Sequence, residues 1–212
     1  MMKKTCLTLA FSAVSILATI QPAAAQSDEV TFDLVPNPQF VNCLRDPRSY
    51  EAPYAKVTVV RGKLNDHLVL QAYNIKPNLK FDLFTIQNSP FLASGATDPN
   101  FKNFGLAWYQ SDVEADRHGR AFVSIRTILL DQIFGFDPVV TLPPTNTFHV
   151  GFWFNDPQDA AACGFDPNKP TPFNGEHKAG PLGMISLPTS SGLGPLCTNP
   201  DTSQNPAVAC HP

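Results

Sequence analysis

The stretch FHVGFWFN, residues 148–155, decides the fold, because its apolar residues recur at every second position. Successive side chains of a β-strand point to opposite faces, so three phenylalanines and a valine share one face. That face predicts a strand of the hydrophobic core. The opposite face combines one large ring with small and polar neighbours: His149, Gly151, Trp153 and Asn155.

Similar short runs, rich in β-branched and aromatic residues, occur on both sides of this stretch and are separated by turn residues. Seven such runs with short connections predict an all-β fold, a single antiparallel immunoglobulin-like β-sandwich of about seven strands with long loops. The turn Asp116-Arg117-His118-Gly119 places glycine where a positive φ is expected. The predicted strands are Lys56–Lys63, His67–Tyr73, Lys80–Gln87, Phe104–Glu114, Ala121–Ile128, Phe148–Asn155 and Leu182–Leu187.

The predicted strands form a single β-sandwich domain, residues 55–187, and the segments on either side of it predict less regular structure. Residues 26–54 are rich in proline and predict an irregular lead-in, and residues 188–212 predict a flexible tail rich in Pro and Ser. Asp156 and Pro157 are suited to begin a short helix that Gly164 ends.

The first 25 residues have the pattern of a secretory signal peptide. Lys3 and Lys4 precede an apolar run, Leu7–Ile20, and Ala23–Ala25 supplies the small residues of a cleavage site. The apolar run is shorter than the roughly 20 residues that span a bilayer. We therefore expect no membrane span and a soluble protein, secreted or periplasmic after cleavage near Ala25.

Cleavage would remove Cys6 and leave four cysteines in an oxidising compartment, where disulfides are expected. Four cysteines allow three connectivities. We favour Cys43 with Cys163, and Cys197 with Cys210, because the second pair would close a short loop in the tail. The alternative is a zinc site made of all four thiolates, but the chain has no C-x-x-C pair to begin one.

Charge and motifs exclude several classes of function. The formal net charge is −3 at pH 7, and Lys and Arg form no cluster of the kind that binds phosphate backbones, so nucleic acid is not expected as a partner. The chain has no G-x-S-x-G, H-E-x-x-H, Walker A or G-x-G-x-x-G motif. We predict no catalytic residue, no metal and no cofactor.

Aromatic residues indicate a candidate binding surface. An exposed Trp153 beside polar groups could stack on a sugar or a peptide, and Trp108 and Tyr109 could add a further ring. Core packing is the alternative for a tryptophan in a sandwich. The loop Ser89–Asn103 is long, and long loops on a rigid scaffold commonly bind ligands. The predicted surface joins this loop to Trp108, Tyr109, His149 and Trp153.

The segment TPFNGEHKAG, residues 171–180, is dense in turn formers yet carries Glu176 and His177 together. With this segment, and with the Trp-Tyr strand that runs into an Asp-x-x-Gly turn at residues 108–119, the chain resembles a group of uncharacterised secreted bacterial proteins. The resemblance covers residues 55–187. It implies a sandwich fold and an exported location, and it supplies no activity.

Two hypotheses of function follow. The first is an exported noncatalytic binding or structural module of the bacterial cell envelope or exterior, whose partner is an unidentified extracytoplasmic ligand such as a carbohydrate or a protein. The second is an enzyme or metal-binding protein with a site around Glu176, His177 and His149.

Overall fold

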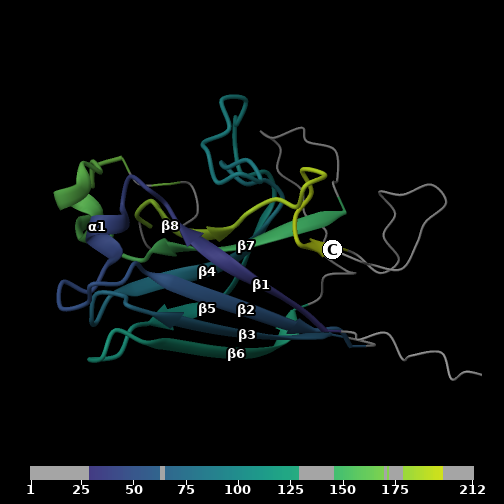
Figure 1. The fold of residues 1–212 in the computed structure, drawn as a ribbon, viewed down its shortest axis with the longest axis horizontal. Helices are drawn as coiled ribbons and strands as arrows, with labels where there is room; N and C mark the ends of the chain where they lie inside the picture. Colours follow the sequence, from purple (N-terminus) through teal and green to yellow (C-terminus); the bar gives the residue numbers. More distant parts are fainter. Residues whose placement is uncertain (1–28, 63–64, 129–145, 170, 172–178, 198–212) are drawn as a thin grey trace, which may run out of the picture.

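The computed structural model describes residues 29–62, 65–128, 146–169, 171 and 179–197, and its regular structure there is almost entirely antiparallel β-sheet (Figure 1). No helix in these ranges is long and apolar enough to cross a membrane. Two short helices, α1 (Val41–Leu44) and the 3₁₀ helix η2 (Pro157–Cys163), accompany the strands. The strands are β1 (Glu29–Pro36), β2 (Tyr54–Val60), β3 (Asp66–Tyr73), β4 (Lys80–Ile86), β5 (Ala107–Glu114), β6 (Ala121–Ile128), β7 (Thr147–Phe154), β8 (Leu182–Ser186) and β9 (Leu196–Cys197).

All seven predicted strands are present, each within three residues of its predicted ends. The predicted short helix is present as η2. The Asp156 carboxylate accepts the Gln158 N–H at 2.8 Å, and Gly164 ends the helix with φ +90°. Gly119 in the β5–β6 turn has φ +71°, as its place in the turn predicts. Local sequence therefore determines these elements.

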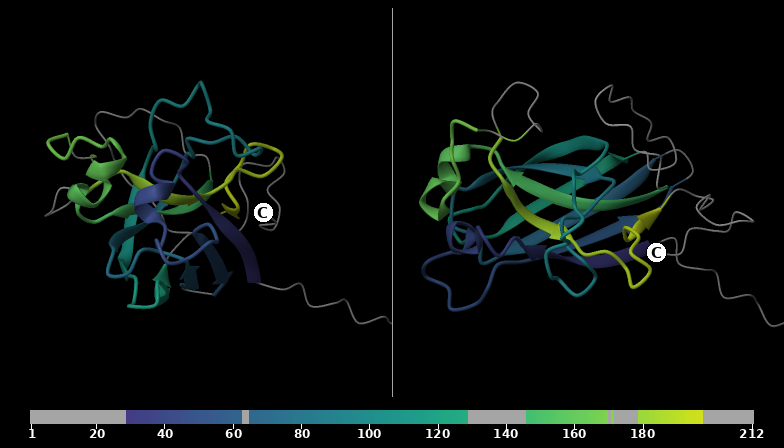
Figure 2. Two further views of the ribbon diagram at one scale, coloured as in Figure 1. Left: turned by 60° about the vertical axis from the view of Figure 1, so that its left-hand side comes forward. Right: turned by 90° about the horizontal axis from the view of Figure 1, so that it is seen from above.

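The strands form one continuous sheet in the order β5-β4-β7-β8-β1-β2-β3-β6, with β9 added to β7. The sheet rolls into a nearly closed barrel, so that β5 and β6 at its two edges lie side by side (Figures 1 and 2). The immunoglobulin-like sandwich of seven strands is not confirmed. A sandwich consists of two sheets packed face to face, whereas here a hydrogen-bonded ladder connects every strand to the next.

Strand β1 is the physical reason for this difference. It pairs with β2 on one side, Leu34 opposite Ala55, and with β8 on the other, Leu34 opposite Ser186. It thereby joins the β2-β3-β6 half of the sheet to the β5-β4-β7-β8 half. The expectation of an irregular lead-in over residues 26–54 is corrected, because this segment contains β1 and α1.

The main hydrophobic core fills the inside of the rolled sheet. The four alternating apolar residues of β7 belong to it, as the period of two predicts, together with inward residues of the other strands. A second cluster lies on the opposite surface of β4, β7 and β8: Phe84, Ile86, Phe91, Trp153, Leu182 and Ile185. The molecule therefore buries both faces of β7, and every residue of this strand is buried.

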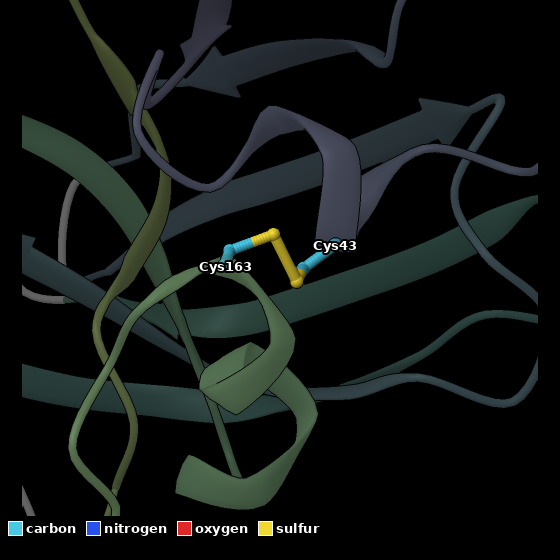
Figure 3. Close-up of a disulfide and its surroundings, with 2 residues drawn as sticks. All are labelled: Cys43 and Cys163. Atoms are coloured by element: carbon cyan, nitrogen blue, oxygen red, sulfur yellow. A yellow bond between two sulfur atoms is a disulfide. The ribbon is translucent and has the colours of Figure 1, made fainter.

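A disulfide between Cys43 of α1 and Cys163 of η2 confirms the first predicted pairing (Figure 3). Its Cα atoms lie 6.1 Å apart, and it joins positions separated by 120 residues. In the chain-entropy description, a cross-link over a loop of this length stabilises the fold by about 5 kcal/mol. Cys210 lies outside the described residues, as do residues 1–28 with the expected signal peptide, so the Cys197–Cys210 pairing and the cleavage site stay predictions.

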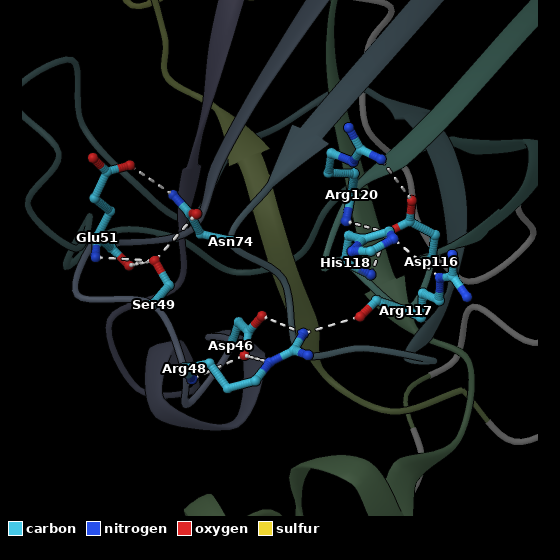
Figure 4. Close-up of polar contacts among 9 residues, drawn as sticks. All are labelled: Asp46, Arg48, Ser49, Glu51, Asn74, Asp116, Arg117, His118 and Arg120. Carbon is cyan, nitrogen blue, oxygen red and sulfur yellow. Dashed lines mark hydrogen bonds and ion pairs between the residues drawn. The ribbon is translucent and has the colours of Figure 1, made fainter.

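A polar network joins the segment after α1 to the β5–β6 turn (Figure 4). The Arg48 guanidinium donates to both oxygens of Asp46, at 3.0 and 2.8 Å, and to the carbonyl of Arg117 at 3.0 Å. In the turn, Asp116 accepts the backbone N–H groups of His118 and Arg120 at 2.7 and 3.0 Å. These bonds hold together the end of the barrel that also carries the disulfide.

Candidate ligand-binding pocket

A pocket of about 400 Å³ lies where β4 ends and β7 begins. Its walls come from three parts of the chain: residues 87–103, the β7 residues Thr147 and His149, and residues 188–194. The loop drawn in teal and the segment drawn in yellow lie beside each other on one side of the barrel in every view (Figures 1 and 2). The volume lies within the range of about 300 to 1,000 Å³ that is typical of small-molecule sites.

Aromatic packing holds the loop on the outer surface of the barrel. The rings of Phe104 and Trp153 meet edge to face with centroids 5.1 Å apart, and Phe84 meets Trp153 in the same way at 5.4 Å. Phe91 adds a second anchor within the same cluster. Trp153 has no exposed surface, so it packs within the second cluster, as the alternative in the sequence analysis expected. It therefore offers no open platform to a sugar.

Hydrogen bonds order the loop itself. The side-chain oxygen of Gln87 accepts the N–H of Leu106 at 2.8 Å, and Asn88 N–H donates to the carbonyl of Phe104 at 3.0 Å. At the tip, Leu92 N–H donates to the carbonyl of Ala96 at 2.8 Å. Hydrogen bonds therefore hold together the two ends of the loop that forms this wall of the pocket.

The opposite wall belongs to the segment that the sequence assigned to a flexible tail. Gly194 N–H donates to the Thr147 hydroxyl at 3.2 Å, and Thr189 N–H donates to the carbonyl of Leu193 at 2.7 Å. Beyond it, β9 pairs with the start of β7, Cys197 opposite Thr147. Residues 188–197 therefore form part of the described fold, and residues 198–212 lie outside it.

His149 is the buried titratable group of the pocket, with 2% of its surface exposed. Its Nδ1 lies 3.1 Å from the carbonyl oxygen of Ser186 and 3.2 Å from the hydroxyl of the same residue. Burial lowers the pKa of His149 to about 4, and the bond to the Ser186 backbone only partly offsets this. The ring is therefore uncharged at neutral pH.

The rest of the lining is mixed in character. Phe91, Leu92, Phe101 and Leu193 supply apolar surface, and amide, hydroxyl and backbone groups supply polar surface. Asp98 and Lys102 bring one charge of each sign, and Asp98 uses one carboxylate oxygen to accept the N–H of Asn100 at 2.8 Å. This arrangement suits a small molecule that is partly apolar and carries no strong net charge.

Two of the other predicted binding residues lie away from the pocket. Trp108 and Tyr109 lie on β5, apart from the pocket lining. Tyr109 is 54% exposed, packs edge-on against Phe84, and donates its hydroxyl to Asp112 at 2.8 Å. Desolvation and this contact with Asp112 raise the pKa of Tyr109 to about 12.

The structure thus unites only the loop and His149 at the pocket, with Trp153 beneath the loop. Glu176 and His177 lie outside the described residues, so their relation to His149 stays untested. Within the described ranges, no three His, Cys, Asp or Glu side chains are grouped so as to hold a metal ion. Gln87, Thr147 and the wall formed by residues 188–194 were not predicted as parts of a site, and no residue pattern singles them out.

Comparison with known proteins adds no relative: no protein-family model matches the chain, and neither the curated proteins nor the solved structures contain a significant match. The function is therefore inferred from the geometry of the site.

Proposed function

We propose that this protein is an exported, noncatalytic binding module and that its ligand occupies the pocket beside His149. The observation that carries the proposal is the state of the His149 ring. Among the described residues, its only hydrogen-bond partners are two atoms of Ser186, and both lie at Nδ1. Nε2 has no hydrogen-bond partner among the described residues, and His149 lines the pocket, so a ligand that donates to Nε2 gains a bond that the described part of the fold leaves unmade.

Two further features support the proposal. The pocket volume favours a small molecule, such as a sugar unit, over a protein partner, which would need a larger contact surface. The Cys43–Cys163 disulfide is compatible with an oxidising compartment and hence with export.

The proposal is tested by ¹H–¹⁵N NMR titration of the mature protein with neutral probes: glucose, galactose, N-acetylglucosamine, phenol and cyclohexanol. We expect at least one probe to give saturable shifts that concentrate in residues 87–103, 147–149 and 188–194. Shifts scattered over the surface, or no saturable shift with any probe, would contradict the proposal.

Two alanines of the loop provide matched variants. Ala93 lines the pocket, whereas Ala96 is exposed on the same loop outside the lining. Ala93→Trp should weaken binding of the active probe at least tenfold by filling the pocket, and Ala96→Trp should leave the binding within twofold of the wild type. Equal effects of the two variants would place the binding elsewhere.

The second candidate is an enzyme or metal-binding protein that combines His149 with Glu176 and His177. An unprotonated imidazole nitrogen on a residue that lines the pocket favours it, because this form accepts protons and binds metal ions. Native mass spectrometry with added Zn²⁺ and a broad hydrolase panel test this candidate. Stoichiometric zinc or turnover that is lost in both Glu176→Gln and His177→Gln would favour it over the binding module.

A further inference from the structure

We infer that the ligand of the pocket is a neutral molecule that donates a hydrogen bond, from a hydroxyl or an amide N–H, to Nε2 of His149. This inference rests on the proposed function, since it names the chemistry of the molecule that the same pocket would bind. It follows from three properties of the site: the tautomer of the ring, the charge balance of the lining, and the apolar walls.

The tautomer is determined by Ser186 at the end of β8. A carbonyl oxygen has lone pairs and no hydrogen, so its contact with Nδ1 at 3.1 Å requires Nδ1 to carry the proton. The Ser186 hydroxyl oxygen lies 3.2 Å from Nδ1 and also accepts the N–H of Val150 at 3.2 Å. In a neutral ring with Nδ1 protonated, Nε2 holds a lone pair and can only accept.

Backbone pairing holds the ring in this orientation. His149 is the third residue of β7, and Ser186 is the last residue of β8, the neighbouring strand in the sheet. Both residues are almost completely buried, so the ring cannot turn over without breaking its bond inside a packed region. The acceptor is therefore preorganised, which reduces the entropy lost on binding.

The charge balance of the lining disfavours an ionic ligand. An anion would meet the lone pair of Nε2, and a buried cation would need a counter-charge. Asp98 is the single acidic residue of the lining and already accepts the N–H of Asn100. Lys102, which also lines the pocket, carries the opposite charge. A neutral donor avoids both penalties. Phe91, Phe101 and Leu193 favour an apolar body attached to that donor.

The first test measures the tautomer in the wild-type protein. Long-range ¹H–¹⁵N NMR spectra distinguish a protonated ring nitrogen from an unprotonated one, and the His149 signals are assigned by their loss in His149→Phe. We expect protonated Nδ1 and unprotonated Nε2 throughout pH 6–8. A protonated Nε2 in this range would overturn the inference.

The second test compares two aromatic probes of similar shape, of which only one carries a hydrogen-bond donor. Phenol carries a hydroxyl, and anisole carries a methoxy group in its place. A net hydrogen bond of about 0.5–1.5 kcal/mol predicts that phenol binds the pocket roughly two- to twelvefold more tightly than anisole. The same preference should disappear in His149→Phe, and cyclohexanol against methoxycyclohexane provides a non-aromatic pair.

The outcomes separate this inference from the proposed function. Equal affinities of phenol and anisole in the wild type, with shifts at the pocket, would overturn the inference and leave the pocket as a binding site. An absence of pocket shifts with every probe would contradict the proposed function and the inference with it. If His149→Phe does not fold, the tautomer and the preference of the wild type for phenol over anisole still test the inference.

Discussion

The Trp153 indole on β7 and the Phe104 ring at the end of the long loop meet edge to face, with their centroids 5.1 Å apart. This contact connects the barrel to the loop that forms one wall of the pocket. It also explains why a tryptophan on the outward face of a strand has no exposed surface. The loop covers the strand, and the tryptophan positions the loop.

Trp153→Ala should lower the free energy of unfolding by about 3–5 kcal/mol, because it removes the largest side chain of the second cluster. Amide hydrogen exchange in residues 91–104 should accelerate more than in β2 or β3. Tyr109→Ala is the control: this exposed ring contacts Phe84 from the neighbouring strand, and its loss should cost about 1 kcal/mol or less. Full protection of the loop amides in Trp153→Ala would refute the anchoring role.

Replacing both Cys43 and Cys163 by alanine should lower the free energy of unfolding by about 2–5 kcal/mol, since the unfolded chain regains a long unconstrained loop. Urea unfolding under oxidising conditions measures the loss. Reductant should then destabilise the wild type more than the variant, and any remaining effect in the variant reports the predicted Cys197–Cys210 bond. A variant as stable as the wild type would show that the disulfide is dispensable.

Asp46 should contribute to stability in a way that is lost in acid. Hydrogen bonds from the side chain and the backbone of Arg48 hold the pKa of Asp46 below its ordinary value of 3.8. A carboxylate with a depressed folded-state pKa stabilises the fold above about pH 4 and loses that contribution as the pH falls through the lower folded value. The urea midpoint measured over pH 2–5 should therefore fall more steeply in the wild type than in Asp46→Asn. Asp33→Asn removes an exposed carboxylate that accepts the Tyr54 hydroxyl at 2.8 Å, and it serves as the comparison variant.

His149 should produce a separate loss of stability at mildly acidic pH. Its folded-state pKa is about 4, against 6.5 for the unperturbed side chain, so the unfolded state binds a proton first as the pH falls. Protonation therefore favours unfolding, by roughly 3 kcal/mol between pH 7 and pH 4. Unfolding curves of His149→Gln should lack this slope, and those of His118→Gln, an exposed histidine, should keep it. A wild-type free energy of unfolding that is flat over this range would show that burial does not lower the pKa of His149.

The alternating pattern of residues 148–155 was sufficient to predict both faces of β7, since the period of a strand is a local property. What covers Trp153 could not be predicted, because Phe104 reaches it through a contact across 49 positions of the chain (153 minus 104). In β1, the apolar residues Val30, Phe32 and Leu34 point inward with the same period of two. This strand was not predicted, because the prolines around it indicated irregular structure. Its pairing with β8, which makes a rolled sheet instead of a sandwich, is a long-range property.

The pocket shows the same division between local and long-range information. The long loop and His149 were predicted as parts of one surface, and the structure brings them together. The composition of residues 188–194 predicted flexibility, because glycine, serine and proline bury little apolar surface. Their place in the wall depends on Gly194 bonding to Thr147, which the order of residues does not reveal.

A crystal structure of the mature protein soaked with phenol decides whether His149 binds a donor in the pocket. We expect a phenol ring among Phe91, Phe101 and Leu193, with its hydroxyl oxygen within about 3.2 Å of the His149 Nε2 atom. Phenol bound only elsewhere on the surface, or bound in the pocket with its hydroxyl directed away from His149, would contradict this expectation.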